Sequence, residues 1–204
     1  MTDSVLTRER ILEAAEDALR RYGPAKANVV DVARALGVSH GSVYRHFESK
    51  AALRDAVTDR WLARIGNPLE KIAAEDGPAA DRLHRWLVKL SKAKRKKALD
   101  DPELFATYIA LAGQAREVVD RHVDHLVGQI VRILADGNES GEFVVEDPDK
   151  TARAIFDATA RFHNPAFASQ WTDPGIDDAL ERVWVLLLGG LQQGDRTRGR
   201  VGVR

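Results

Sequence analysis

The chain has 204 residues, of which 44% are hydrophobic and 30% are charged, so it can bury an apolar core and is not an intrinsically disordered sequence. It contains no cysteine, which excludes disulfides, thiolate metal sites and a cysteine nucleophile. Lys plus Arg, 31, equals Asp plus Glu, 31, so the net charge does not point to a nucleic-acid partner. The N-terminal sequence lacks the apolar stretch of a signal peptide, and the longest apolar run, residues 183–191, is too short to span a bilayer. We therefore expect a cytoplasmic protein that does not enter a membrane.

Apolar residues recur at helical spacing along almost the whole chain, beginning with an amphipathic helix that the Gly-Pro pair at 23–24 should end. Two short apolar patterns follow, over 29–36 and 40–47, and a longer one starts at Lys50 and should break or kink at Pro68. Further helical patterns cover 81–99, 102–112, 117–134, 148–162 and 176–191, and the predicted loops between them include 136–142. The sequence therefore predicts an all-α fold, with an N-terminal three-helix head followed by a larger helical body.

The stretch Asn28–Lys50 has the spacing of a helix-turn-helix, because a short helix ends at a glycine, three residues form the turn and a second short helix follows. Gly37 can adopt the left-handed conformation that the sharp turn needs. Val38 can fill the crevice between the helices, and Ser39 can cap the second one.

With Val43 and Phe47 facing inward, the second short helix presents a polar, aromatic and cationic surface that suits the major groove. Its members are His40, Gly41, Ser42, Tyr44, Arg45 and His46. The alternative is that Tyr44 and His46 pack the small domain and that Arg45 is an ordinary solvated side chain.

Three matching segments extend this pattern: ILEAA from Ile11, Tyr22-Gly23, and VARALGVSHGSVYRHFESKAAL ending at Leu53. On these residues the first part of the chain resembles the DNA-binding domain of the TetR family of bacterial transcriptional regulators. The resemblance implies a helix-turn-helix DNA-binding domain over 1–50 and a helical ligand-binding and dimerisation domain over 51–195. The Arg/Gly-rich tail, 196–204, is expected to be disordered.

The resemblance also implies residue roles on double-stranded DNA. The predicted DNA-binding residues are Asn28, Ser39, His40, Gly41, Ser42, Tyr44, Arg45, His46 and Lys50. We expect His40 and Arg45 to contact base edges, since arginine can pair bidentately with guanine. Lys50 and Asn28, each at the start of a helix, would hold phosphates with the free backbone N–H groups there. Ser42, Tyr44 and His46 would touch phosphate or sugar.

The function that follows is a ligand-responsive transcriptional regulator, by default a repressor, which binds a palindromic operator as a homodimer and is released by a small-molecule effector. No enzyme motif is present in the sequence, neither a Gly-rich phosphate loop nor a nucleophile elbow nor a metalloprotease helix, and we predict neither an enzyme nor a cofactor. The alternative is a helical adaptor or small-molecule-binding protein that does not recognise DNA.

Aromatic, apolar and hydrogen-bonding residues between 83 and 171 are candidates to line an effector pocket, because this mixture suits an amphipathic organic ligand. They are Trp86, Phe105, Tyr108, Ile109, His122, Leu126, Phe156 and His163. Residues of these types at helical spacing are also typical of ordinary core. His122 and His125 could share a metal with His163 or a carboxylate, but the pair lacks a third ligand in sequence and we predict no metal site.

The last helix, 176–191, is apolar around most of its circumference and contains Gly189-Gly190, which permits close approach of another helix. Both features fit a four-helix dimer interface formed with residues 149–162 of each protomer. The alternative is a central core helix of a monomer.

The basic run Lys92–Lys97 could contact nucleic acid or an acidic partner, or form a solvated face.

Overall fold

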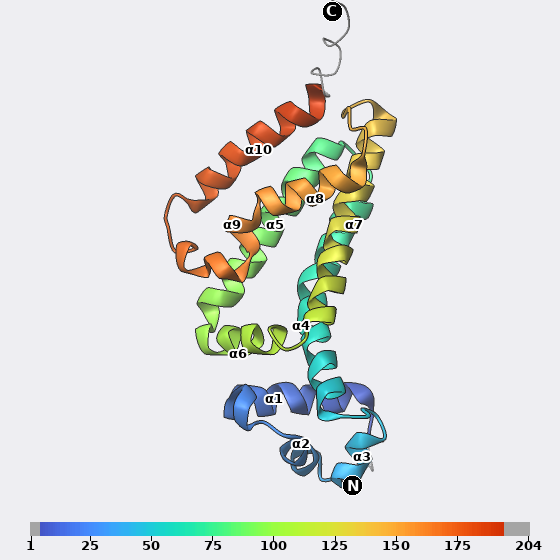
Figure 1. Ribbon diagram of the computed structural model, residues 1–204, viewed down its shortest axis with the longest axis vertical. Coiled ribbons are helices and arrows are strands. Elements are labelled where there is room, and N and C mark those ends of the chain that lie inside the picture. Colours follow the sequence, from blue (N-terminus) through green and yellow to red (C-terminus); the bar gives the residue numbers. More distant parts are fainter. Residues whose placement is uncertain (1–4, 194–204) are drawn as a thin grey trace, which may run out of the picture. The chain divides into compact units, whose positions relative to one another are not determined.

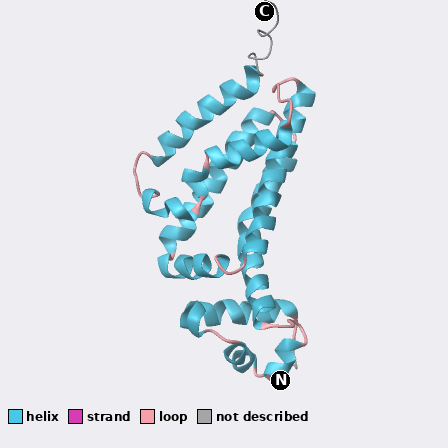
Figure 2. Ribbon diagram, viewed as in Figure 1, coloured by secondary structure: helices cyan, strands magenta, loops and turns pink. Residues whose placement is uncertain are grey.

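A computed structural model describes residues 5–193 of the chain, and throughout these residues the regular secondary structure is helical, without a strand (Figures 1 and 2). The helices are α1 (Arg8–Lys26), α2 (Val29–Leu36), α3 (His40–Tyr44), α4 (Lys50–Ala74), α5 (Ala79–Asp100), α6 (Pro102–Ala112), α7 (Arg116–Ser140), α8 (Pro148–Ala158), α9 (Ala160–His163), the 3₁₀ helix η1 (Pro165–Gln170) and α10 (Ile176–Gln193). The predicted all-α class is confirmed. The predicted tail, 196–204, lies outside the described residues.

The described chain forms two compact units. The first contains residues 5–64 and 101–122, and the second contains 65–100 and 123–193. The sequence suggested a division at residue 50, whereas the structure groups the first part of α4 and all of α6 with the head, by which we mean α1, α2 and α3. The longer grouping arises because α4 and α6 both contribute apolar side chains to the core of the first unit.

The first unit is built on α1, whose Ile11, Ala15 and Leu19 are buried on one face. The Thr7 side chain caps the start of this helix by accepting a hydrogen bond from the Arg10 N–H. Gly23 has φ 70° and ψ 170°, so the helix is interrupted there before one more turn follows. The predicted stop at the Gly-Pro pair is therefore a kink.

Ion pairs connect α4 to α1 within the first unit. The Arg60 guanidinium lies 2.9 Å from a carboxylate oxygen of Glu9, 3.5 Å from one of Glu13 and 3.2 Å from one of Glu16. Arg64 adds a 2.9 Å contact to Glu16. The three glutamates recur at i, i+4 and i+7, so one face of α1 meets one turn of α4.

The second unit is centred on α5. Trp86 is fully buried, and its indole N–H donates a 2.8 Å hydrogen bond to the Gln129 side chain on α7. Buried Arg82 donates to the Ala73 carbonyl and to a carboxylate oxygen of Asp136, 3.2 and 2.8 Å away. Other buried apolar side chains of this unit come from α5, α7 and α8 and include Leu83, Leu87, Leu90, Ile130, Ile133, Leu134 and Ile155. Leu180 of α10 belongs to a cluster with Phe162 and Ile176.

The helices differ from the prediction at two places: α4 has no break at Pro68, and the predicted loop at 136–142 is wrong. The helix α4 continues through Pro68 to Ala74, although proline removes one backbone donor. The predicted loop at 136–142 is helical as far as Ser140. Gly137 is retained in that helix because the Phe143 ring lies where its Cβ would be, 2.2 Å from the ideal Cβ position.

The helix α10 buries Ile176, Leu180 and Trp184 on one side. On another side Val185 and Leu186 are 67% and 77% exposed, so α10 is not the central core helix of a monomer. Among the described residues, no helix combines the length and the apolar character that crossing a membrane requires.

Candidate nucleic-acid interface

The turn between α2 and α3 is fixed by backbone geometry and two side-chain caps. Gly37 has φ 67° and ψ 28°, in the left-handed region. The Val38 N–H donates to the Ala33 carbonyl at 3.0 Å, and the Gly37 N–H donates to the Arg34 carbonyl at 3.2 Å, which closes the end of α2 as a Schellman motif. The Ser39 hydroxyl accepts from the Ser42 N–H at 3.1 Å and caps α3. The predicted helix-turn-helix is confirmed.

The inner face of α3 fixes the orientation of this helix on the head. Val43 and Phe47 are buried, as predicted. The Arg8 guanidinium stacks over the Phe47 ring at 4.1 Å and donates a 3.0 Å hydrogen bond to the His46 carbonyl. The role of Arg8 could not be predicted from the sequence, because nothing local signals a contact between residues 38 positions apart.

The outer face of α3 presents His40, Gly41, Tyr44 and Arg45 to solvent. The His40 and Tyr44 rings pack edge to face at 6.4 Å. The Arg45 guanidinium donates a 3.0 Å hydrogen bond to the Ser42 hydroxyl, which restrains the long side chain. The face is therefore partly ordered before any ligand arrives.

Four predicted DNA-binding residues are less central to this face. Ser42 and His46 are half-buried, and Ser39 is exposed while its hydroxyl caps α3. Asn28 caps α2 by accepting a 3.0 Å hydrogen bond from the Asp31 N–H. Its side chain is thus already engaged, and a phosphate there would meet the free N–H groups of the first turn.

Lys50 is exposed at the first position of α4. Its ammonium forms no ion pair with any residue from 5 to 193. The preceding Ser49 hydroxyl accepts a 3.0 Å hydrogen bond from the Ala52 N–H and caps the helix. A free cation beside a helix N-terminus is suited to an anionic group.

The predicted ligand-lining residues are divided between the two units. Phe105, Tyr108, Ile109 and His122 lie in the first. Tyr108 is buried, and its ring is stacked on that of Trp61 with 4.5 Å between the centroids. Burial, aided by the charge of a nearby glutamate, raises the pKa of Tyr108 to about 12. Tyr108 therefore packs in the core of this unit.

Trp86, Leu126, Phe156 and His163 lie in the second unit, and all four are buried. The rings of Phe156 and His163 are 4.4 Å apart, and His163 Nε2 lies 3.1 Å from the Phe156 carbonyl oxygen. Burial lowers the pKa of His163 to about 4, and the charge of Lys94 acts in the same direction. The imidazole is therefore neutral at pH 7. A ligand role for these eight residues stays a prediction.

The basic run does not form one continuous charged face. Arg95 makes a bidentate contact with Asp177 at 2.8 and 3.0 Å. Lys94 is buried, and this burial lowers its pKa to about 8. Lys92 and Lys96 are exposed.

Between residues 5 and 193, no three His, Asp or Glu side chains gather as a possible metal site.

Two family models match the chain. One, described as bacterial regulatory proteins of the tetR family, matches residues 11–57. The other, described as the tetracyclin repressor-like C-terminal domain, matches residues 79–184, more than half of the chain. The chain belongs to the TetR family.

Among its relatives is the uncharacterized HTH-type transcriptional regulator Rv1255c of Mycobacterium tuberculosis (strain ATCC 25618 / H37Rv), 34% identical over 103 residues, which are 50% of this chain and 49% of the relative. This TetR-family chain thus spans about half the length of the first curated relatives it matches. The HTH-type transcriptional repressor KstR of Mycolicibacterium smegmatis is 28% identical over 151 residues, 74% of this chain and 71% of KstR. The structure of RolR in complex with resorcinol has a TM-score of 0.60 at 19% identity, and the alignment covers 90% of this chain and 86% of RolR. At that identity the likeness to RolR shows the fold alone.

Proposed function

We propose that this TetR-family chain is a ligand-responsive, DNA-binding transcriptional regulator, and specifically a repressor that binds a palindromic operator as a homodimer. The observation that carries the proposal is the face of α3. It projects His40, Tyr44 and Arg45 into solvent from a turn that is closed on both sides by caps. Arginine in the major groove can read guanine through two hydrogen bonds. Lys50 at the start of α4 would hold a phosphate and set the register.

A dimer is supported by the exposed apolar face of α10. Val185 and Leu186 are among the most exposed large hydrophobic side chains of the described residues, and Gly189 and Gly190 have open space where a Cβ would be. Small residues beside exposed leucine permit close packing of a second helix, and a two-fold dimer buries the same patch on both protomers. Two recognition helices would then enter successive major grooves, about 34–36 Å apart.

Repression and effector release are supported by the relatives. KstR is named a repressor, and RolR was solved with the small phenol resorcinol. In this chain, an effector that binds better to the DNA-free arrangement than to the DNA-bound one would release the operator. By linkage, the effector weakens DNA binding by the same factor as DNA weakens effector binding.

Selection of binding sites from random-sequence DNA by the purified full chain tests the proposal. We expect enrichment of a two-fold symmetric sequence whose half-sites are centred about 10 base pairs, or a multiple of that, apart. Footprinting should then protect both half-sites. No enrichment over the starting pool, at low as well as moderate salt, would contradict it.

A further inference from the structure

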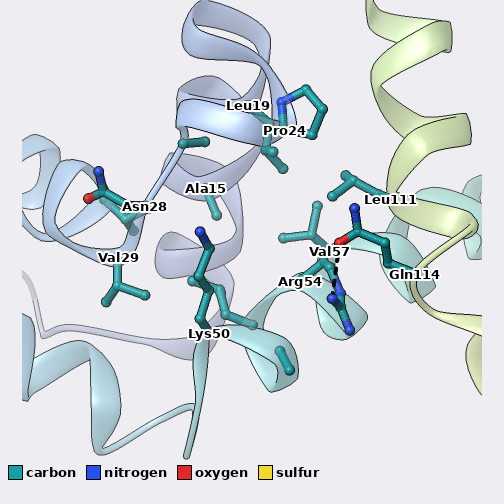
Figure 3. Close-up of a pocket in the computed structure, with 14 residues that line it drawn as sticks. Ala15, Leu19, Pro24, Asn28, Val29, Lys50, Arg54, Val57, Leu111 and Gln114 are labelled. Carbon is teal, nitrogen blue, oxygen red and sulfur yellow. Dashed lines mark hydrogen bonds between the residues drawn. The ribbon is translucent and has the colours of Figure 1, made fainter.

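A second candidate binding site lies within the first unit, separate from the α3 surface. It is a pocket of about 300 Å³, open to solvent and lined by residues of α1, α2, α4 and α6 (Figure 3). This volume lies at the lower end of the range for small-molecule sites. Its apolar walls come from four helices and consist chiefly of Leu19, Val29, Val32, Leu53, Val57 and Leu111. None of the eight predicted ligand-lining residues contributes to it.

The polar edge of the cavity is cationic. Lys50 and Arg54, one turn apart on α4, both line it, and no Asp or Glu does. The Arg54 guanidinium is held in place because it donates to the Gln114 amide oxygen at 3.2 Å, as the dashed line in Figure 3 shows, and to Asp55 at 2.9 and 3.0 Å. Arg54 is restrained and 26% exposed, whereas the Lys50 ammonium has no ion pair within residues 5–193.

The residues that line the cavity indicate which class of ligand it would bind. The aliphatic walls favour a ligand with an apolar part, because binding removes that apolar surface from water. The Lys50 ammonium and the Arg54 guanidinium both favour a negative charge at the edge. A cationic ligand would be repelled by the same groups, and a fully apolar ligand would leave them unused. We propose that this cavity binds a small amphipathic monocarboxylate, with its apolar part against Leu19 and Val57 and its carboxylate at Lys50 and Arg54.

The site has a consequence for regulation, which rests on the proposed function. Asn28 and Lys50 line the cavity and are also predicted phosphate contacts. A carboxylate paired with Lys50 neutralises the charge that would otherwise hold a phosphate, so the two anions compete for it. The ligand would therefore lower DNA affinity through the head itself.

Binding is tested without DNA, on the full chain, with hexanoate, octanoate and decanoate as probes and 1-octanol as the uncharged match of octanoate. We expect methyl NMR signals of Leu19, Val57 and Leu111 to shift on titration with at least octanoate. Arg54→Gln removes a charge-assisted contact and should weaken octanoate about tenfold while changing 1-octanol binding less than about twofold. Ala51→Phe, at an exposed position that lines the cavity, should weaken both probes by filling the mouth.

The matched control is Arg64→Gln, which removes the same charge from α4 about 15 Å along the helix axis and outside the cavity. It should leave the octanoate Kd within about twofold of wild type. Thermal unfolding of each variant shows whether it is folded. The proposal is overturned if no carboxylate shifts the cavity methyls, or if Arg54→Gln and Arg64→Gln behave alike.

A second arm adds the selected DNA. Octanoate should lower the DNA affinity of wild type and have several-fold less effect on Arg54→Gln. If the chain binds octanoate in the cavity but no DNA at all, the proposed function fails and the binding site stands. If DNA binds and octanoate does not reach the cavity, the site fails and the proposed function stands.

Discussion

At the scale of single residues, two buried titratable groups on neighbouring elements make stability depend on pH. His163 lies against Phe156, and burial lowers its pKa from 6.5 to about 4. Between these values the unfolded chain binds a proton that the folded chain does not, so the free energy of unfolding falls as pH decreases from 6.5 towards 4. Urea unfolding at pH 7 and pH 5 should show that wild type loses about 1–2 kcal/mol more than His163→Gln. Equal losses in both proteins would show that His163 does not take part.

Lys94 should lower the free energy of unfolding at pH 7, because its burial removes a charged ammonium from water at that pH. Its pKa falls from 10.5 to about 8. Lys94→Met keeps the length of the side chain and removes the charge, so it should raise the free energy of unfolding at pH 7 by about 1–3 kcal/mol. This gain should shrink between about pH 8 and 10.5, where the folded wild type releases its proton and becomes more stable.

The control is Lys92→Met, two residues earlier on α5 and exposed, which should change stability by less than about 0.5 kcal/mol. Chemical denaturation at pH 7 and pH 10 measures both variants. If Lys94→Met destabilises the fold at pH 7, the buried ammonium is not a net cost.

Residue roles that depend on local chain geometry could be predicted from the sequence. The left-handed Gly37, the Ser39 cap and the burial of Val43 were all predicted, because each follows from spacing within one turn. The Arg8 contact with Phe47 and His46 could not be, since it joins positions that only tertiary packing brings together.

At the scale of elements, α7 contains two glycines whose surroundings differ. A Cβ at Gly137 would lie 2.2 Å from the Phe143 ring, whereas one at Gly128 would meet nothing within 4 Å. Gly137→Ala should therefore destabilise the fold by about 1–3 kcal/mol because the ring must move. Gly128→Ala should stabilise it by about 0.5–1 kcal/mol through helix propensity.

Urea denaturation of the two variants measures the difference directly. The substitution is the same and the helix is the same, so a shift of equal sign in both would contradict the packing of Phe143 on Gly137.

The helical period predicted the existence of the helices better than their ends. The range of α6 agrees at both ends with the prediction, because Asp101 caps it and Pro102 occupies its first position. The predicted loop at 136–142 was wrong, because α7 continues past Gly137, against which the Phe143 ring packs. The helix α4 likewise continues through Pro68 without a break. Similarly, α8 ends at Ala158, where the Thr159 hydroxyl donates to the Ile155 carbonyl, and no local stop signal marks the place.

At the scale of the whole molecule, the exposed face of α10 predicts self-association. Leu186→Glu places a charge where the side chain is 77% exposed, so the isolated chain should fold normally while the dimer is lost. Light scattering after size-exclusion chromatography should give a dimer mass for wild type and a monomer mass for the variant. Leu99→Glu, the same change at a 49% exposed position on α5, is the control and should remain dimeric. A wild-type monomer at all concentrations would contradict the proposed dimer.

The division of the chain into a head and a larger helical body could be predicted only in outline. The family motif identifies the head, but the grouping of α6 with it depends on contacts between distant residues. The cavity beside Lys50 and Arg54 could not be predicted from the sequence, because its walls come from four helices. The Tyr108 ring is stacked on that of Trp61, and this contact between distant residues could not be predicted from helical spacing.

We propose that the outer face of α3 reads DNA, and fluorescence anisotropy on the selected operator with two arginine variants tests this directly. Arg45→Ala should weaken specific binding by roughly 5- to 150-fold and reduce the preference over scrambled DNA, since a bidentate guanine contact is worth about 1–3 kcal/mol. Arg34→Ala, on α2 and paired with Asp31 outside this face, should change affinity less than about threefold. Equal effects of the two substitutions, or an unchanged preference in Arg45→Ala, would contradict the account.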